Sequence, residues 1–271
     1  MSDFSTVLFT YFFFISFNFP GYSQNVSSPK YDITVRTKFV DVDNMGRLYV
    51  VTPENSVIHY DVNKTEKFRY TNRRSGEITH INLSNPLKIM LYAKDFGQVI
   101  ILDNTLAEVD IFNLFDFGFT EISAVGVSND DSYWIYDPLR FRLLKISRSG
   151  RIICESANLM DFGIFKPYVT KIIESGNRVV LFDPQKGFYI FDNFGQFISF
   201  LPIQHVKSFR FDGQQVIWFT GKSLNVTSLN GMTTKEIIVL PDEETAVVDD
   251  LINLPKTMLK VYKPGIAFIS K

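Results

Sequence analysis

The stretch VDVDNMGRLYVVTPENSVIHYDVN (Val40–Asn63) predicts three short strands joined by two tight turns. Asp-Asn-Met-Gly separates the first two apolar segments, and Pro-Glu-Asn-Ser separates the second from the third. Both separators are rich in residues that favour turns. A fourth segment, TEKFRY, follows directly, so one unit contains four strands.

The same unit recurs along the chain. A short apolar segment that ends in or contains an aromatic residue returns every 37 to 46 residues, with a strand and a turn before it and a hairpin after it. The six marker aromatics are Tyr49, Tyr92, Tyr136, Phe182, Phe219 and Tyr262. No long amphipathic helix interrupts the pattern, and the spacing is typical of propeller blades. The sequence therefore predicts an all-β, six-bladed β-propeller with four-stranded blades.

The last unit stops after its third strand, at Lys271, while a spare strand-like segment, YDITVRT (Tyr31–Thr37), precedes the first unit. We expect this N-terminal strand to pair with the third strand of the last unit and close the ring. Closure removes an unpaired sheet edge, which is a site of aggregation. Residues 24–271 are then one propeller domain.

The first unit, Val40–Asn63, resembles an NHL-type propeller repeat. The resemblance lies in an Asp before a Gly turn, then LYVV, then a strand that ends in Asp. It is degenerate in the other units. It implies a fold and says little about chemistry.

Composition narrows the function. The net charge is −1 and no basic block is present, which disfavours nucleic-acid binding. The single cysteine, Cys154, excludes an internal disulfide. Residues 1–23 have the layout of a cleaved signal peptide, with an apolar run from Val7 to Phe19 followed by Pro20 and Gly21. We therefore expect an exported protein whose mature chain does not span a membrane.

Asp-Phe-Gly occurs three times, at residues 95–97, 116–118 and 161–163. In protein kinases this tripeptide binds magnesium, but the Gly-rich loop, strand lysine and His-Arg-Asp loop of a kinase are missing. The first copy falls in a hairpin between a second and a third strand, and the other two fall between units. We therefore interpret them as turns, and expect all three on one face of the ring.

Enzymatic alternatives have weak support in the sequence. No Gly-x-Ser-x-Gly elbow accompanies the three histidines, His59, His80 and His205. Six-bladed lactonases hold a metal with channel acids, for which the candidates are Asp41, Asp43, Asp130, Asp249 and Asp250. Met45, however, stands where a calcium loop needs an oxygen ligand. We predict a non-enzymatic protein with no catalytic, metal-binding or cofactor-binding residues, and keep a metal-dependent lactonase as the alternative.

Binding is the preferred function. Hairpins between second and third strands share one propeller face with the loops between blades, and this face receives many aromatic residues. The candidate protein-contact residues are Phe96, Phe115, Phe117, Phe119, Phe162, Phe165 and Tyr168. Exposed together, they would form an apolar patch of the kind that marks a protein-binding site.

The stretch SNPLKIMLYAKDFGQVIILDNTLAEVD (Ser84–Asp110) resembles the plug proteins of the type 9 secretion system. This resemblance implies a periplasmic, outer-membrane-associated protein that docks on a large β-barrel translocon and occludes its pore. A propeller that senses a sugar or peptide ligand is a further alternative.

Overall fold

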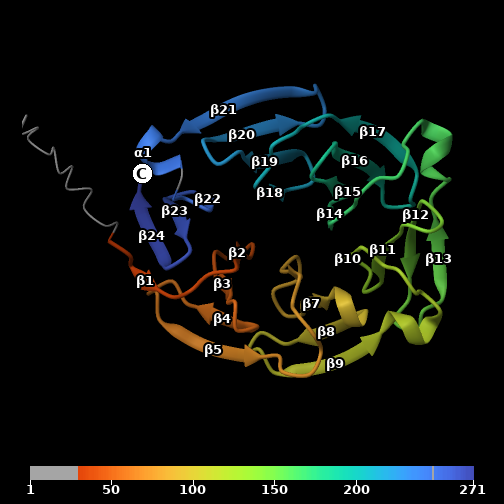
Figure 1. The fold of residues 1–271 in the computed structure, drawn as a ribbon, viewed down its shortest axis with the longest axis horizontal. Coiled ribbons are helices and arrows are strands. Elements are labelled where there is room, and N and C mark those ends of the chain that lie inside the picture. The colour runs from red at the N-terminus through yellow and green to blue at the C-terminus, as the bar shows by residue number, and fades with distance from the viewer. Residues whose placement is uncertain (1–29, 246) are drawn as a thin grey trace, which may run out of the picture. The chain divides into compact units, whose positions relative to one another are not determined.

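The computed structural model describes residues 30–245 and 247–271, and these form six four-stranded antiparallel sheets arranged in a ring (Figure 1). The predicted six-bladed propeller is confirmed. The predicted signal peptide, residues 1–23, lies outside the described residues. Among the described residues, no helix has the length and apolar character needed to cross a membrane.

Each blade runs from the centre of the ring outward. The innermost strands are β2 (Phe39–Val42), β6 (His80–Asn82), β10 (Ala124–Val127), β14 (Lys171–Ser175), β18 (Ser208–Phe211) and β22 (Asp250–Asn253). The second strands are β3 (Leu48–Val51), β7 (Ile89–Ala93), β11 (Tyr133–Asp137), β15 (Arg178–Asp183), β19 (Gln215–Phe219) and β23 (Thr257–Tyr262). The third strands are β4 (Ser56–Tyr60), β8 (Gln98–Leu102), β12 (Arg142–Ile146), β16 (Gly187–Asp192), β20 (Ser223–Ser228) and β24 (Gly265–Ser270). The outer strands are β5 (Glu66–Thr71), β9 (Glu108–Asn113), β13 (Ile152–Glu155), β17 (Phe197–Leu201), β21 (Thr233–Val239) and β1 (Ile33–Thr34).

The N-terminal strand closes the ring, as the sequence predicts. β1 pairs antiparallel with β24, with Ile33 opposite Ile266. The strand itself is short, but flanking backbone bonds extend the contact, because Asp32 N and Thr37 N donate to carbonyls of residues 266 and 263. The sixth blade is therefore built from both ends of the described chain.

The core consists of six apolar layers, one between each pair of neighbouring blades. The marker aromatics of the repeat all lie in these layers and are at most 7% exposed. The repeat is thus a packing pattern: each blade alone has two apolar faces and needs two neighbours to cover them.

The outer strands pair irregularly with the third strands of their blades. In blades one to five, the pairing of the third strand with the outer strand contains a register shift. An extra residue of this kind increases the local twist of the strand. In three blades an Asp opens the turn just before the shift and accepts backbone N–H groups; these residues are Asp61, Asp103 and Asp192.

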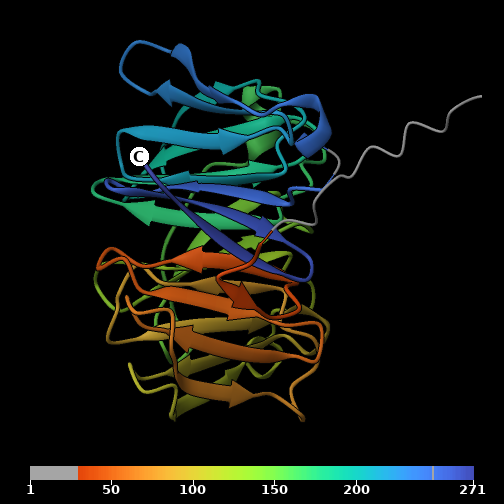
Figure 2. The same cartoon turned by 90° about the vertical axis from the view of Figure 1, so that its left-hand side faces the viewer.

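We call the face formed by the second-to-third hairpins and the blade linkers the hairpin face. It points toward the viewer in Figure 1 and to the right in Figure 2, where α1 (Asp242–Thr245) marks it. It also contains three short 3₁₀ helices, η1 (Lys94–Phe96), η2 (Leu114–Phe117) and η3 (Leu159–Phe162). The turns on the other side form the opposite face.

Candidate functional site

Each Asp-Phe-Gly copy is the end of one of the three 3₁₀ helices. Gly97, Gly118 and Gly163 follow η1, η2 and η3 with φ angles of 60°, 83° and 74°. This left-handed conformation favours glycine because a Cβ would clash with the backbone. The hairpin that holds η1 and the linkers that hold η2 and η3 all lie at the hairpin face, as predicted.

Two of these helices are copies of one hexapeptide, Asn-Leu-x-Asp-Phe-Gly, which begins at Asn113 and at Asn158. In both, the Asn side chain accepts a hydrogen bond from the backbone two residues later. The following leucines, Leu114 and Leu159, are fully buried. The cap and the buried leucine fix each linker to the blades. The recurrence of the hexapeptide is visible in the sequence, but its 3₁₀ conformation is not.

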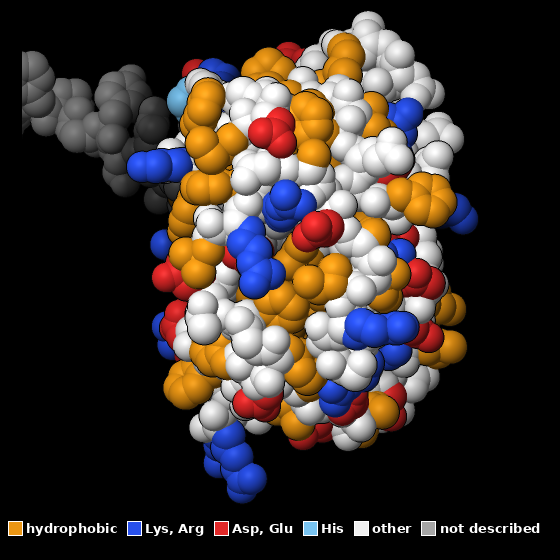
Figure 3. Space-filling model, turned by 90° about the vertical axis from the view of Figure 1, so that its right-hand side faces the viewer, with side chains coloured by type: hydrophobic (Ala, Val, Ile, Leu, Met, Phe, Trp, Pro, Cys, Tyr) orange, Lys and Arg blue, Asp and Glu red, His pale blue; other side chains and the backbone are white. Residues whose placement is uncertain are grey.

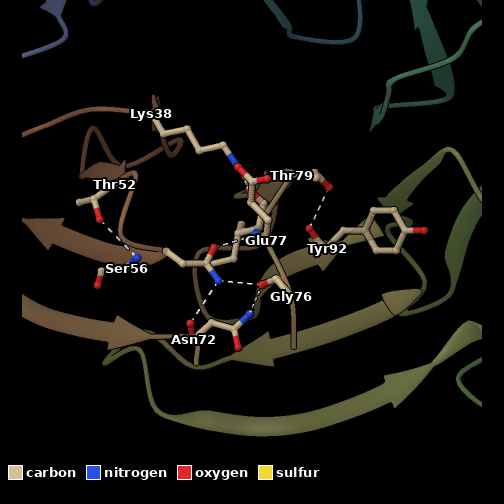
Figure 4. Close-up of polar contacts among 10 residues, drawn as sticks. Lys38, Thr52, Ser56, Asn72, Gly76, Glu77, Thr79 and Tyr92 are labelled. Carbon is tan, nitrogen blue, oxygen red and sulfur yellow. Dashed lines mark hydrogen bonds and ion pairs between the residues drawn. The ribbon is translucent and has the colours of Figure 1, made fainter. Parts of the chain in front are cut away.

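The phenylalanines of the three copies pack onto glycines or aromatics of neighbouring segments. A Cβ placed on Gly76 would lie 2.2 Å from the ring of Phe96. Gly76 belongs to the linker between the first two blades, where its carbonyl accepts from Asn55 and Asn72, at 2.7 and 3.0 Å (Figure 4). A fixed linker therefore supports one side of Phe96 and leaves the other side free.

The seven predicted contact residues divide into two groups. Five are between 41% and 60% exposed, and we call these five the aromatic patch: Phe96, Phe115, Phe162, Phe165 and Tyr168. Of the other two, one is buried and one is partly buried. Phe119 is buried in the layer between the second and third blades, and Phe117 packs against the same layer and the backbone of Gly150. Sequence alone could not separate the two groups, because the burial of each ring depends on which blade lies next to it.

A groove of about 430 Å³ lies within the aromatic patch. Phe115 and Tyr168 line it together with Ile122, and Lys94 and Glu121 provide charges at its sides. The Lys94 ammonium lies 5.8 Å from the centroid of the Tyr168 ring. Residues from three blades thus meet here, and the groove combines aromatic walls with charges of both signs.

Hydrophobic side chains gather along the left margin of Figure 3, which is the edge of the hairpin face seen from the rim. The rim itself mixes hydrophobic and charged side chains. Charged side chains lie between the hydrophobic ones, so the apolar surface of the hairpin face is interrupted by charges (Figure 3).

The central channel is the second candidate site. Two cavities, of about 260 and 430 Å³, lie on the hairpin side and the opposite side of the channel. Six residues line both cavities. One is Ile81, and we call the other five the channel waist: Asp41, His80, Lys171, Phe209 and Arg210. All five come from innermost strands. Their side chains meet in the channel because the innermost strands of the blades surround it.

Charges of both signs meet at the waist. Arg210 Nη2 lies 2.8 Å from Asp250 Oδ2, and its Nε lies 3.6 Å from Asp41 Oδ1. Burial lowers the pKa of Lys171, and Arg210 lowers it further, while Asp41 and Asp250 oppose the shift. Burial, followed by the charge of Lys171, holds the pKa of His80 well below its usual value. The waist is therefore a desolvated and charged site.

Four of the five acids proposed for a metal site pair with cations of the chain, and the fifth, Asp249, is partly buried directly before β22. Asp41 and Asp250 face the two channel cations, Asp43 pairs with Arg47 at 2.6 Å, and Asp130 pairs with Lys145 at 2.7 Å. Within the described part of the chain, no three His, Cys, Asp or Glu side chains are grouped so as to hold a metal ion.

The arrangement is that of a six-bladed β-propeller. No protein-family model matches the sequence, and no curated protein matches it. Among solved structures, the WD40 domain of Pan2 from Neurospora crassa is similar at a TM-score of 0.56, with 7% identity over 87% of this chain and 79% of that chain. A streptogramin B lyase is similar at a TM-score of 0.55, with 11% identity over 91% and 85% of the two chains. Virginiamycin B lyase from Staphylococcus aureus is similar at 0.53, with 10% identity over 84% and 78%.

These likenesses contradict the prediction that the chain is non-enzymatic. Two of the three similar folds are those of lyases, and another virginiamycin B lyase structure is of a catalytically inactive variant with quinupristin. A propeller of this arrangement therefore also serves enzymes, and the sequence-based exclusion of catalysis does not hold. At identities of 7% to 11% the likeness establishes the fold alone, and the activities belong to those proteins.

Proposed function

We propose that this propeller docks on a protein partner through the aromatic patch of its hairpin face. The observation that supports this most strongly is that five aromatic side chains are 41% to 60% exposed on one face, and that four of them sit on the two linkers that begin with an Asn cap and a buried leucine. Aromatic residues are enriched at the centres of protein interfaces. Loops that are already ordered lose little conformational entropy when they bind.

The groove gives the patch a specific shape. Its walls, Phe115, Ile122 and Tyr168, suit an apolar side chain of the partner, and Lys94 and Glu121 suit polar groups around it. An anchor side chain in such a pocket, surrounded by polar contacts, is the usual anatomy of an interface hot spot.

We further propose that the partner is a large outer-membrane β-barrel translocon, whose pore the propeller plugs from the periplasm. The support is the resemblance of Ser84–Asp110 to the plug proteins of the type 9 secretion system. This stretch includes η1, and with it Phe96 of the aromatic patch. Export to the periplasm rests on residues 1–23 of the sequence.

The test is an affinity pull-down of the tagged full chain from native, detergent-solubilised cell envelopes, read by mass spectrometry. We expect a large membrane β-barrel to be recovered with the wild type. Phe96→Ser and Phe165→Ser together should reduce its recovery at least tenfold. Phe194→Ser is the matched control, because Phe194 is 69% exposed in the turn between β16 and β17 on the opposite face.

Recovery of the wild type only as a free monomer would overturn both proposals. Recovery of a soluble partner that depends on Phe96 and Phe165 would support docking and overturn the translocon. Equal recovery with all variants would show that another surface binds.

A further inference from the structure

The channel waist holds three polar groups that lack a hydrogen-bond partner among the described residues. Arg210 Nε and His80 Nε2 are buried without one, and His80 is only 7% exposed. Lys171 Nζ lies 3.8 Å from Asp41 Oδ2, which is longer than a hydrogen bond. A buried polar group left unpaired costs about 1–3 kcal/mol. Two such groups, Arg210 Nε and His80 Nε2, next to the partly exposed Lys171 ammonium indicate that an acceptor belongs between them.

The neighbouring acids do not fill this role. Asp250 is already engaged, because its carboxylate accepts from Ser208 Oγ, from Leu251 N and from Arg210 Nη2. Asp41 Oδ1 accepts from the backbone N–H of Val42 at 2.9 Å and stands too far from Arg210 Nε for a second bond. The unused donors of Arg210 and Lys171 are therefore free for a ligand.

The hairpin side of the waist has an aromatic wall next to polar side chains, which include Thr170, Lys207 and Ser208. Phe39, Phe182 and Phe209 line the cavity of about 260 Å³ on that side. The Lys171 ammonium lies 5.2 Å from the centroid of the Phe209 ring, so the cation and the aromatic wall are next to each other. A ligand that reaches the cations from the hairpin face has to pass along these rings.

We propose that the channel waist binds the carboxylate of a small monocarboxylate, whose apolar part lies against Phe39 and Phe182. Arginine and lysine offer only donors, so the ligand group must accept hydrogen bonds, and an anion makes these bonds charge-assisted. A carboxylate has two oxygens, which match two separate donors, Arg210 Nε and Lys171 Nζ. The aromatic wall selects acids with an apolar ring or short chain over purely polar anions. This inference does not depend on the docking proposed above.

The test uses benzoate as the probe, with benzamide as its neutral counterpart and inorganic phosphate as a polar anion. Binding to the folded state raises the free energy of unfolding by RT ln(1 + [L]/Kd), so the midpoint of thermal unfolding keeps rising with ligand concentration. We expect benzoate to raise the midpoint as its concentration rises, and benzamide and phosphate to raise it far less at equal concentration. An equal effect of benzamide would overturn the role of the charge, and an equal effect of phosphate would overturn the role of the aromatic wall.

Variants locate the site. Lys171→Met should weaken benzoate binding, measured by titration calorimetry, at least tenfold, while Lys235→Met on exposed β21 should leave it unchanged. His80→Gln, which replaces the imidazole by a neutral polar amide, is the second variant in case Lys171→Met does not fold, and should weaken binding about threefold. No benzoate effect on the wild type, or the same affinity in wild type and both channel variants, would overturn the proposal. The double variant Phe96→Ser, Phe165→Ser should bind benzoate as the wild type does.

Discussion

At the residue scale, His59 is the least satisfied side chain of the core. It is 5% exposed, its ring stacks on Tyr49 at 4.8 Å and on Phe68 at 5.7 Å, and both ring nitrogens lack a hydrogen-bond partner among the described residues. Burial, with a smaller effect of Arg47, lowers its pKa. The imidazole therefore binds a proton more readily in the unfolded chain, and the free energy of unfolding falls as the pH drops below about 6.5.

We predict that His59→Phe removes part of this acid sensitivity. The ring stack is kept, and about 1 kcal/mol of stability is gained at pH 7.5 because no unpaired nitrogen remains. Urea unfolding at pH 7.5 and pH 5 measures the effect, and the gain should be larger at pH 5. His80 also has a lowered pKa and remains in the variant, so the loss at low pH shrinks without vanishing. His205→Asn at the surface is the control, since Asn tolerates the φ of 59° found there. The same pH dependence in His59→Phe and wild type would contradict the prediction.

At the element scale, the strands could be predicted from the sequence, and the short helices η2 and η3 in the blade linkers could not. The strands were predictable because apolar segments, turn residues and marker aromatics recur with one period. The 3₁₀ helices were not, since three or four residues give no periodicity and their buried leucines look like strand residues. The exposure of Phe96 and the burial of Phe119 depend on which blade stands opposite, and this is a tertiary property.

The channel waist was predictable only in part. His80 was expected to face the channel because it lies in an innermost strand, and it does. Lys171 and Arg210 gave no signal in the sequence, because isolated cations in amphipathic strands are common at surfaces. Only the ring places them opposite Asp41.

Strand β10 approaches β14 closely, and Gly126 makes this possible. A Cβ at Gly126 would lie 2.8 Å from the carbonyl oxygen of Ile172 and 3.0 Å from its Cγ2. We predict that Gly126→Ala forces the third and fourth blades apart and costs about 1–3 kcal/mol, as overpacking does. Chemical denaturation measures the loss. Gly231→Ala is the matched control, because its Cβ would meet only Thr233 at 3.7 Å. A loss in Gly231→Ala equal to that in Gly126→Ala would mean that glycine flexibility, and not the blade contact, sets the effect.

At the scale of the whole molecule, stability depends on joining the two ends of the ring. Every blade covers its two apolar faces with two neighbouring blades. If the ring opened, the first and last blades would each expose one apolar face to water. Ile33 of the closing strand is 5% exposed and belongs to the layer between the last and first blades, together with Val40 and Ile266. Its neighbour Thr34 points to solvent. Substitutions at Ile33 and at Thr34 can therefore distinguish the packing that closes the ring from the presence of β1 alone.

We predict that Ile33→Asp lowers the free energy of unfolding by at least about 3 kcal/mol, because it buries an unpaired charge where the ring closes. Thr34→Asp should change it by no more than about 0.5 kcal/mol, as surface substitutions usually do. Loss of β1 also leaves β24 as an open edge, so Ile33→Asp should form aggregates that light scattering detects at temperatures where Thr34→Asp stays monomeric. Equal behaviour of the two variants would mean that β1 is only an appendage of the sixth blade. The difference expected between the two variants follows from the alternation of side chains along a strand, which turns Ile33 into the core and Thr34 toward solvent. One inward side chain is therefore enough for a two-residue strand to close the ring.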